Sequence, residues 1–588
     1  MVELVWDGKY DAQGKRVAPL RVALPFQTVE TVNESAQQRQ KMLDLFAKGR
    51  NQDWRNRLIW GDKKYVLPSL LPEFAGKVDL IYIDPPFATG ADFSLDVEIG
   101  ENQFTKNPSM IEQKAYRDTW GYGIDSFLQW FYETTAYLYD LLSETGSIYV
   151  HLSHHIGQYA KVILDEVFGH DNFQNEIIWL YKTGGATKTR FSRKHDNIFF
   201  YTKSSSSWAF NPQKERSYMM HTYGFSKSDF QIDEATGQQY SMVYARDVWD
   251  IPSVGSATSE RVGYPTQKPE ALLERIVKAS SNEGDLILDC FCGSGTTASV
   301  AEKLGRRWIT CDLGRFAIHT ARKRLLAIEE VQPFIVQNLG KYERQIWQKA
   351  EFGEQAQATI RQYRKFILDL YHADVVEGYT WLHGKKDGRM VHVGSVDSPI
   401  ALGDVKQIAI DFQRSIGTGK NAPKVAGVYI LGWDFALDMN ETARQIAQEA
   451  GLDVKFVRIP REVLEGKAVE QDDIRFFELA ALSVDIKTKG REVSVALTDF
   501  MVPPDDVPQD VIEAVNNWSE WIDYWAIDFD YQDDAFHNQW QSYRTRQDRK
   551  LDLQRTHTYK EGGQYTIVVK VIDILGNDTT KAITIEVV

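Results

Sequence analysis

Four consecutive residues, Asp84, Pro85, Pro86 and Phe87, combine a carboxylate, two rings that stiffen the backbone and an aromatic face. They follow an apolar run, which predicts a strand that ends in a functional loop. A carboxylate and a proline-held carbonyl can accept hydrogen bonds from one amino group, and an aromatic ring can stack on a planar heterocycle. We therefore treat these four residues as candidate catalytic residues for chemistry on a planar amine. A plain Asp-Pro-Pro turn at a strand end is the alternative.

A second loop, residues 289–297, also follows an apolar strand and reads Asp-Cys-Phe-Cys-Gly-Ser-Gly-Thr-Thr. Gly293 and Gly295 can adopt backbone angles that are closed to other residues and let the main chain approach a ligand. A helix beginning at Thr296 would offer free amides to an electronegative group. The next predicted strand ends at Asp312, which is placed to bind a ribose diol. The loop fits neither the Walker pattern nor Gly-x-Gly-x-x-Gly, and a glycine loop that is only a tight turn is the alternative.

The cysteine and histidine content gives no metal site. Cys290, Cys292 and Cys311 are the three cysteines, and no second pair lies at zinc spacing, so we interpret them as small buried thiols. The adjacent His154 and His155 have no evident partnering carboxylate nearby. We assign no metal.

The elements that must position the two loops form an α/β pattern that begins at residue 56. Strands are predicted at residues 58–60, 78–83, 147–152, 176–181, 196–201, 286–289 and 307–312. Helices are predicted at residues 64–74, 269–280, 296–304 and 315–330, with a further helix ending at Gly146. Both loops would then lie at the carboxyl ends of strands in one doubly wound sheet, where such sheets bind ligands.

The second half of the chain has a different pattern. Residues 342–372 are predicted as one long helix, and strands and helices alternate over residues 407–412, 425–431, 443–450 and 454–457. Alternating strands at residues 565–574 and 581–588 are typical of a β-sandwich. We predict an N-terminal extension (1–55), a catalytic domain (56–332) with insertions at about 91–124 and 208–262, a helical and α/β region (333–500) and a β-sandwich-like domain (501–588).

Charge and hydropathy limit the partners and the location. The net charge of −14 argues against indiscriminate coating of nucleic acid, because that requires an excess of cations. One stretch, residues 181–195, has no acidic residue and carries the candidate DNA-binding residues Lys182, Lys188, Arg190, Arg193 and Lys194. A solvated loop is the alternative. The chain has no apolar run long enough for a membrane span and its start lacks a signal pattern, so we expect a cytoplasmic protein without membrane contact.

Several segments in a fixed order carry a family resemblance. They are the Asp84 motif, residues 146–151, residues 194–201 and the Pro-Thr-Gln-Lys-Pro of residues 265–269, which leads to the glycine loop. Together they resemble S-adenosylmethionine-dependent DNA adenine-N6 methyltransferases of the β class, and specifically type III-like modification methylases. In this class the Asp-Pro-Pro-Tyr/Phe motif precedes the target-recognition segment and the glycine motif comes last. The resemblance covers about residues 56–330.

The resemblance implies a fold and a role for each motif residue. The fold would be a Rossmann-like methyltransferase fold, a mostly parallel sheet with helices on both faces and a circularly permuted motif order. Asp84 and the Pro85 carbonyl would accept hydrogen bonds from adenine N6, and Phe87 would stack on the flipped base. The residues around the methionine and adenosyl parts of the cofactor would be Asp289, Phe291, Gly293, Gly295 and Thr296, with Asp312 on the ribose and Lys268 near the pocket. The Ser153-His154-His155 segment departs from the acidic residues expected there.

The function implied is site-specific methylation of adenine N6 in duplex DNA after base flipping, within a restriction–modification or phage-defence system. Cytosine-N4 or other amine methylation, and a catalytically silent DNA-recognition subunit of a nuclease complex, are the alternatives. The cofactor implied is S-adenosyl-L-methionine. The partners implied are duplex DNA, a separate helicase or nuclease restriction subunit, since the sequence lacks ATPase and nuclease motifs, and a second copy in a homodimer. The end of the chain is similar to an immunoglobulin-like PKD domain.

Overall fold

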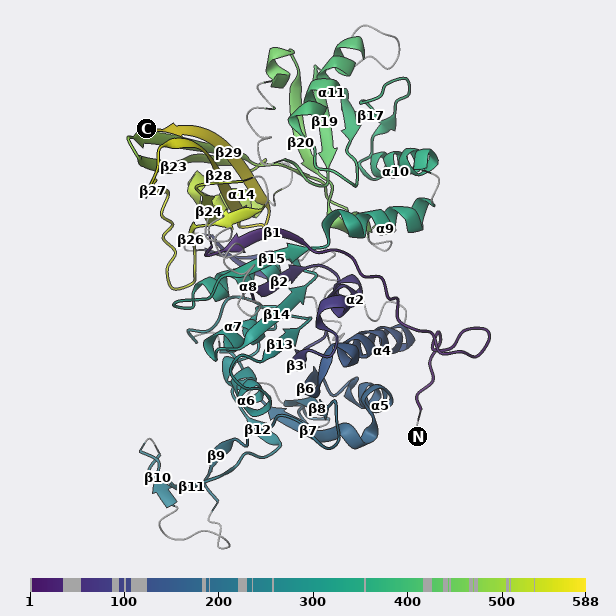
Figure 1. Cartoon of the computed structure of the whole chain (residues 1–588), viewed down its shortest axis with the longest axis vertical. Coiled ribbons are helices and arrows are strands. Elements are labelled where there is room, and N and C mark those ends of the chain that lie inside the picture. Colours follow the sequence, from purple (N-terminus) through teal and green to yellow (C-terminus); the bar gives the residue numbers. More distant parts are fainter. Residues whose placement is uncertain are drawn as a thin grey trace. The chain divides into compact units, whose positions relative to one another are not determined.

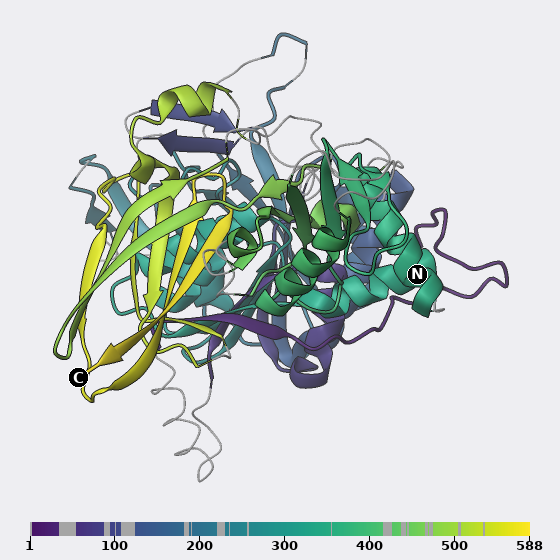
Figure 2. The same cartoon turned by 90° about the horizontal axis from the view of Figure 1, so that it is seen from above.

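The computed structural model of the chain (Figures 1 and 2) describes most of its residues. The described ranges are 3–34, 54–86, 95–99, 102–106, 124–181, 187–189, 191–219, 230–234, 236–255, 258–353, 356–415, 426–436, 443, 446–464, 469, 474–503, 507, 509–532 and 535–588. The chain divides into two compact units, of which the first holds residues 1–23, 56–92 and 114–331. The second holds residues 24–55, 93–113 and 332–588.

A mostly parallel sheet forms the centre of the first unit, in the order β12-β7-β8-β6-β3-β13-β14-β2. Its strands are β12 (Val248–Asp250), β7 (Phe173–Leu180), β8 (His195–Thr202), β6 (Leu142–Leu152), β3 (Val78–Ile83), β13 (Leu286–Asp289), β14 (Arg307–Asp312) and β2 (Asn56–Trp60). From β6 to β2 all neighbours are parallel, whereas β8 runs antiparallel to β6 and β7. The inner strands are buried along almost their whole length, as strands covered on both faces must be.

Helices cover both faces of this sheet. One group contains α2 (Lys63–Phe74), α4 (Ile124–Leu141) and α5 (Gly157–Phe168), and the other contains α6 (Glu270–Ser280), α7 (Thr296–Lys303) and α8 (Arg315–Leu326). Figure 1 shows the two groups on opposite sides of β3, β13 and β14. The predicted fold class, a mostly parallel sheet with helices on both faces, is confirmed.

The parallel register brings the two functional loops to the same edge. Leu80 pairs with Ile287 and Ile81 with Leu288, so β3 and β13 end side by side. Asp84 follows the end of β3, and Asp289 is the last residue of β13. Two loops about 200 residues apart in the sequence are therefore neighbours in space.

One predicted helix end in this unit is wrong. The helix expected to end at Gly146 ends instead at Leu141, and β6 begins at the next residue. Leu142 already pairs with Val78 of β3, and the register shifts before Ser147. The chain therefore enters the sheet before it reaches the glycine, which lies inside the strand and not at a helix cap.

The second unit contains an α/β sheet in the order β16-β17-β18-β19-β20-β21. Its strands are β16 (Asp374–Val375), β17 (Gly384–Lys386), β18 (Arg389–Val393), β19 (Gly427–Gly432), β20 (Asp453–Arg458) and β21 (Phe477–Glu478). Its helix α11 (Leu402–Ser415), together with β19 and β20, falls on segments where alternating elements were predicted. The single long helix predicted at residues 342–372 is wrong: α9 (Gly340–Phe352) and α10 (Ala356–Leu370) are separate, and Gly353 ends α9 with a φ of +81°.

The C-terminal strands of the second unit form two packed sheets, as predicted for a β-sandwich. One has the order β22-β23-β27 and the other β26-β24-β28-β29 (Figure 2). The strands are β22 (Ala481–Lys489), β23 (Glu492–Met501), β27 (Gln554–Thr558), β26 (Trp540–Tyr543), β24 (Ile522–Asp528), β28 (Gly563–Asp573) and β29 (Asp578–Val587). Side chains from both sheets, among them Val495, Trp525 and Val569, share one buried core. The domain boundaries themselves stay a prediction.

Strands distant in the sequence also pair within the second unit. β1 (Gln27–Val32) is antiparallel to β15 (Phe334–Asn338) and parallel to β25 (Phe536–Asn538). The buried Glu30 of β1 accepts a hydrogen bond from Lys570 of β28 at 2.7 Å.

Among the described helices, each is too short or too polar to cross a bilayer.

Candidate active site

Lys268 connects the two functional loops. Its Nζ forms an ion pair with Asp84 Oδ2, and its backbone carbonyl accepts a hydrogen bond from Thr296 Oγ1 at 3.2 Å. Lys268 precedes Pro269, whose extended backbone caps α6. The backbone of Lys268 therefore lies beside the glycine loop, whereas its ammonium group lies on the carboxylate of the first loop.

The two oxygens of Asp84 have different surroundings. Oδ2 is held by Lys268, whereas Oδ1 is buried and has no hydrogen-bond partner among the described residues. A buried carboxylate oxygen without a donor is costly, so its presence points to a donor supplied by a ligand. Pro85 is buried and Pro86 is partly buried, while Phe87 lies outside the described residues. Asp84 thus has one oxygen, Oδ2, that is bound by Lys268 and another, Oδ1, that can accept a hydrogen bond from a ligand.

A buried group of side chains lies behind Asp84. His151 Nδ1 is 3.9 Å from Asp84 Oδ1 and 2.9 Å from the Tyr82 hydroxyl, and His151 Nε2 is 3.5 Å from Asp196 Oδ2. Burial alone would raise the pKa of Asp196, but the hydrogen bond and charge of His151 bring it below its usual value. Burial also raises the pKa of Tyr82 well above its usual value. The sequence motifs include the segments that contain His151 and Asp196, but they do not predict that His151 lies between Asp84 and Asp196.

The glycine loop takes the left-handed turns that its sequence predicts. Gly293 has a φ of +48° and Gly295, which caps α7, has a φ of +74°. A side chain at Gly295 would meet the Cβ of Ala321 at 2.7 Å and its Cα at 3.0 Å. A side chain at Gly293 would meet the Tyr264 ring at 3.2 Å. The structure therefore requires Gly295 for the close packing of α8, whereas at Gly293 the constraint is the backbone turn.

Hydrogen bonds within the chain engage the polar groups of this loop. Asp312 accepts from the backbone N–H groups of Gly293 at 2.9 Å and Gly314 at 2.8 Å. Asp289 accepts from the Phe291 backbone at 2.9 Å and from the Thr297 hydroxyl at 2.6 Å. These two carboxylates thus fix the shape of the loop.

A buried charge network fixes the start of α7 and was not found from the sequence. Arg324 of α8 donates to Thr296 Oγ1 at 2.8 Å and to Glu270 of α6 at 2.9 Å. Lys303 of α7 also donates to Glu270, at 2.7 Å. The Thr296 hydroxyl is thus occupied by Arg324 and by the Lys268 carbonyl, so its observed role is to hold the loop.

An aromatic wall stands beside the glycine loop. The Phe291 ring lies 5.6 Å from the Trp130 ring of α4, and Lys63 Nζ lies 4.1 Å from the Trp130 ring centre and 5.5 Å from that of Phe291. Cations over aromatic faces are attracted to their electrons. Nothing in the spacing of the sequence connected Trp130 or Lys63 with Phe291, because the three residues come from separate elements.

The buried Asp289 carboxyl makes the stability of this unit depend on pH. Burial raises the pKa of Asp289 to about 7, although hydrogen bonds from Thr297 and Phe291 act in the opposite direction. Because the folded-state pKa lies above the unfolded value, the protonated Asp289 favours the folded state. This contribution to the free energy of unfolding is complete below about pH 4 and is lost as the pH rises through about 7. The effect is on the order of 4 kcal/mol at most.

We predict that Asp289→Asn, which keeps the side-chain shape, removes this loss. Its thermal unfolding midpoint should fall less than that of the wild type between pH 5 and pH 8, in scans of the full-length protein. The exposed Asp171→Asn is the matched control and should follow the wild type. Parallel pH curves for Asp289→Asn and the wild type would contradict the assignment.

The predicted basic loop joins β7 to β8. Lys188 and Arg193 are exposed and Lys194 is partly buried, and Arg193 Nη1 lies 3.3 Å from His155 Nε2. Lys182 and Arg190 lie outside the described residues. Because β8 starts at the edge where β6 ends, with Asn197 opposite Leu152, the loop arises at the same edge of the sheet as Asp84.

The three cysteines are buried and unpaired in disulfides, and burial raises the pKa of each thiol. They therefore pack as small apolar side chains. Within the described ranges, no three His, Cys, Asp or Glu side chains gather in a way that would hold a metal ion.

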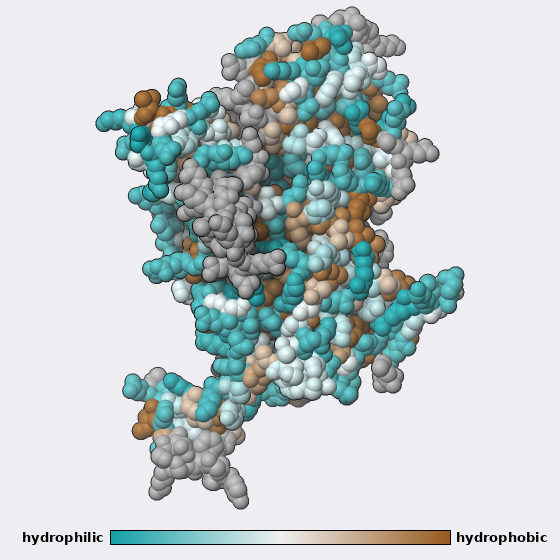
Figure 3. Space-filling model, in the orientation of Figure 1, coloured by the Kyte–Doolittle hydropathy of each residue, from teal (hydrophilic) through white to brown (hydrophobic). Residues whose placement is uncertain are grey.

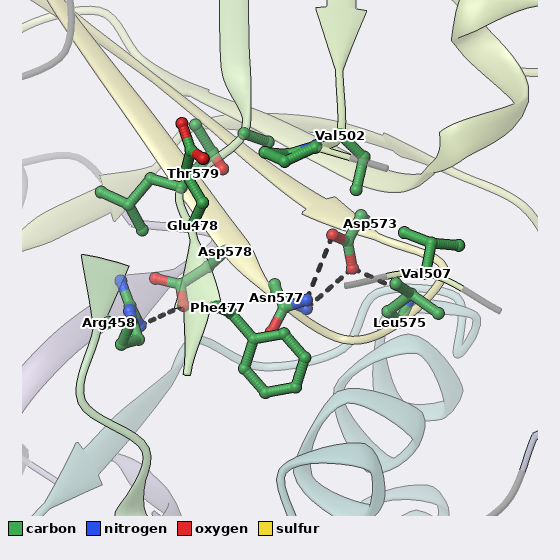
Figure 4. A pocket seen from close by; sticks show the side chains of 13 residues that line it. Arg458, Phe477, Glu478, Val502, Val507, Asp573, Leu575, Asn577, Asp578 and Thr579 are labelled. Carbon is green, nitrogen blue, oxygen red and sulfur yellow. Dashed lines mark hydrogen bonds and ion pairs between the residues drawn. The ribbon is translucent and has the colours of Figure 1, made fainter. Parts of the chain in front are cut away.

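One pocket, drawn in Figure 4, lies in the second unit where Arg458 of β20 pairs with Asp578 of β29 at 2.9 Å. Asn577 donates to the nearby Asp573 (Figure 4). The interior volume of about 20 Å³ has room for roughly one water molecule. We interpret it as a packing gap between the α/β sheet and the sandwich.

Comparison with known proteins identifies the family. A family model described as DNA methylase, covering N6 and N4 methylation, matches residues 78–323. Type II methyltransferase M.HpaI of Haemophilus parainfluenzae is 32% identical over 249 residues, which make up 42% of this chain and 68% of that relative. The chain belongs to this DNA methylase family. The match places Asp84, Lys268 and the glycine loop of this methylase within the region that defines the family.

Two further relatives extend the comparison. DNA adenine methyltransferase YhdJ of Escherichia coli (strain K12) is 28% identical over 283 residues, or 46% of this methylase and 82% of YhdJ. Type II methyltransferase M.EcaI of Enterobacter cloacae is 29% identical over 338 residues, or 47% of this chain and 71% of that protein.

Solved structures match parts of this methylase at low overall similarity. The M1.HpyAVI–SAM complex is 20% identical, covers 46% of this chain and all of its own, and has a TM-score of 0.30. The PKD1 domain of Vibrio anguillarum Epp is 18% identical, covers 18% of this chain and 92% of its own, and has a TM-score of 0.12. The PKD-like character of the C-terminal sandwich stays a prediction.

Proposed function

We propose that this methylase transfers a methyl group from S-adenosyl-L-methionine to N6 of a specific adenine in duplex DNA. The observation that carries the proposal is the Asp84 carboxylate, which has a buried, unpartnered oxygen and is joined through Lys268 to the glycine loop. Membership of the DNA methylase family and the name of YhdJ, a DNA adenine methyltransferase, support it. The aspartate that begins the motif favours adenine over cytosine N4.

The residues around the glycine loop fit the cofactor. The left-handed Gly293 is only partly buried at the carboxyl edge of the sheet, and Phe291 with Trp130 would supply an aromatic wall for an adenosyl group. Lys63 would supply a cation for the methionine carboxylate, and Asp312 would accept hydrogen bonds from the ribose hydroxyls. When bound, the cofactor would supply a methyl group on a sulfonium, a good leaving group. Thr296, Asp289 and Gly295 would hold the loop.

The catalytic role of Asp84 follows from the weakness of the nucleophile. The lone pair of an exocyclic amine is delocalised into the base, so acceptors aimed at its hydrogens must draw it toward the sp³ state. Asp84 Oδ1 would accept one N6 hydrogen and the Pro85 carbonyl the other, with Phe87 stacked on the base. When N6 has gained the methyl group, Asp84 is the nearest base for the surplus proton. Lys268 and His151 would keep the carboxylate in position.

DNA contacts are proposed for two surfaces. The cations Lys182, Lys188, Arg190, Arg193 and Lys194 would bind phosphates beside the site. The second surface is a ribbon of β9 (Lys214–Ser217), β10 (Phe230–Ile232) and β11 (Gln239–Tyr244) within the predicted recognition segment. Its register places Lys214 opposite Tyr244 and Arg216 opposite Met242 on one face. Figure 3 shows apolar residues among hydrophilic ones on this ribbon, which suits contact with base edges.

The wider context is also a proposal. We infer a modification methylase of a restriction–modification or phage-defence system, acting in the cytoplasm. A separate helicase or nuclease subunit would supply cleavage, with the second unit as its docking region. A homodimer is also proposed as the assembly.

Modification-sensitive long-read sequencing of DNA from cells that express the protein tests the proposal. The expected result is one adenine motif, fully N6-methylated with the wild type and unmodified with Asp84→Ala. N4-methylcytosine at a defined motif would assign cytosine as the target instead. The absence of any mark, with cofactor-binding protein present, would favour a silent recognition subunit.

A further inference from the structure

Phe191 is the most exposed large apolar side chain in the described part of the chain, with 98% of its surface accessible. It belongs to the loop between β7 and β8, and its near neighbours in sequence include the exposed cations Lys188 and Arg193 and the partly buried Lys194. Water around a fully exposed phenyl ring is unfavourable, so burial of this ring against a partner would stabilise the complex.

The base of the loop that carries Phe191 lies near the catalytic carboxylate. The Tyr181 N–H donates to the Lys194 carbonyl at 3.2 Å and closes the base of the loop. Asp196, the second residue of β8, lies 3.5 Å from His151, which lies next to Asp84. Phe191 is five residues before Asp196, so the chain allows a separation of at most about 18 Å between them.

The charge of the loop indicates which partner the ring meets. Residues 181–195 contain no acidic residue, and a cationic loop at this edge is suited to the phosphates on either side of a target base. An enzyme that acts on a base must take it out of the stack, which leaves a space between two base pairs. Flat apolar side chains are known to enter such spaces and keep the duplex open.

We propose that Phe191 inserts into the DNA stack at the position left by the extruded adenine, while Lys188, Arg193 and Lys194 hold the flanking phosphates. The inference rests on the proposed function and adds to it a residue for base extrusion. Phe191 stacks on the neighbouring bases and stabilises the open duplex, whereas Phe87 stacks on the extruded base itself.

The experiment compares Phe191→Ala, Phe191→Trp and the control Tyr159→Ala on the motif found by sequencing. Tyr159 is another exposed aromatic residue, 44% accessible, on α5. Each variant is assayed on a fully paired duplex and on a duplex in which the target adenine faces a mismatched base. The measurements are kcat/KM for the DNA and the fluorescence of 2-aminopurine at the target position.

On the paired duplex, Phe191→Ala should lose about 5- to 150-fold in kcat/KM, the range for loss of one base–aromatic stack, and 2-aminopurine fluorescence should fall. On the mismatched duplex the loss in kcat/KM should shrink to about threefold or less, because little energy is needed to extrude a base that is already mispaired. Phe191→Trp and Tyr159→Ala should stay near wild type on both. Arg193→Gln should reduce the salt dependence of binding, whereas Phe191→Ala should leave it unchanged.

An equal loss on paired and mismatched DNA, or wild-type rates for Phe191→Ala on paired DNA, would overturn the proposal. Loss of binding to another protein with methylation intact would assign Phe191 to a protein contact and also overturn it. If the wild type itself methylates no DNA, the proposed function fails instead, so the two failures are distinguishable.

Discussion

Replacing Asp84 with alanine is expected to lower the rate of methyl transfer by at least about a thousandfold while cofactor affinity changes by less than about threefold. The large loss follows because the variant removes the acceptor for an N6 hydrogen and the base for its surplus proton. Cofactor affinity survives because the glycine loop is held by its own bonds from Asp312, Asp289 and Arg324. Transfer of labelled methyl groups to the motif DNA measures the first quantity and calorimetry measures the second.

Asp79→Asn is the matched control for this prediction. Asp79 lies on the same strand, β3, and its carboxylate accepts from the Leu286 backbone at 2.9 Å and from Ser143 at 3.3 Å, away from the site. We expect this variant to transfer methyl groups at a rate close to wild type. Asp84→Ala with a rate within tenfold of wild type would refute the role given to the carboxylate.

The sequence was sufficient to predict that the two loops lie together, because both follow the ends of buried strands. Buried parallel strands read as continuous apolar runs, and their carboxyl ends share one edge of the sheet. Asp84 and Asp289 could therefore be placed together before any coordinates were known. The left-handed turns at Gly293 and Gly295 were predictable for a similar reason, because glycine is the residue that adopts them readily.

Contacts between separate elements could not be predicted in the same way. Gly295 faces Ala321 of α8, Arg324 reaches both Thr296 and Glu270, and Trp130 of α4 comes beside Phe291. Each depends on how two helices pack against the sheet, which local patterns do not encode. For this reason the sequence predicts a cofactor contact for Thr296 but does not reveal that two protein groups already bind its hydroxyl.

The two errors in the predicted helices have different causes. The apolar pattern continues through residues 342–372, but Gly353 takes a left-handed turn and separates two helices that pack on one core. At Gly146 the glycine suggested a helix cap, whereas pairing with β3 had already begun at Leu142. Strand pairing therefore decided the boundary before Gly146 against the local signal, whereas a local glycine turn decided the boundary at Gly353.

The second large effect is expected for Lys268→Met, which should lower kcat about a hundredfold with little change in KM for the cofactor. The ion pair between Lys268 and Asp84 is largely buried, with 12% and 16% of the two side chains accessible. Removing one partner of such a pair leaves the other charge buried and free to reorient or bind other groups. Steady-state kinetics measures the effect, and Lys268→Arg should recover part of it.

Lys303→Met is the control, because Lys303 pairs with Glu270 near the same loop but is 45% accessible. Its kcat should stay within about twofold of wild type, as expected for an exposed pair. The decisive comparison is the double variant Asp84→Ala with Lys268→Met. If Lys268 acts by positioning Asp84, the double variant is no slower than Asp84→Ala alone, because the two losses are not additive. Additive losses would show that Lys268 acts independently of the carboxylate, through the glycine loop that its carbonyl holds at Thr296.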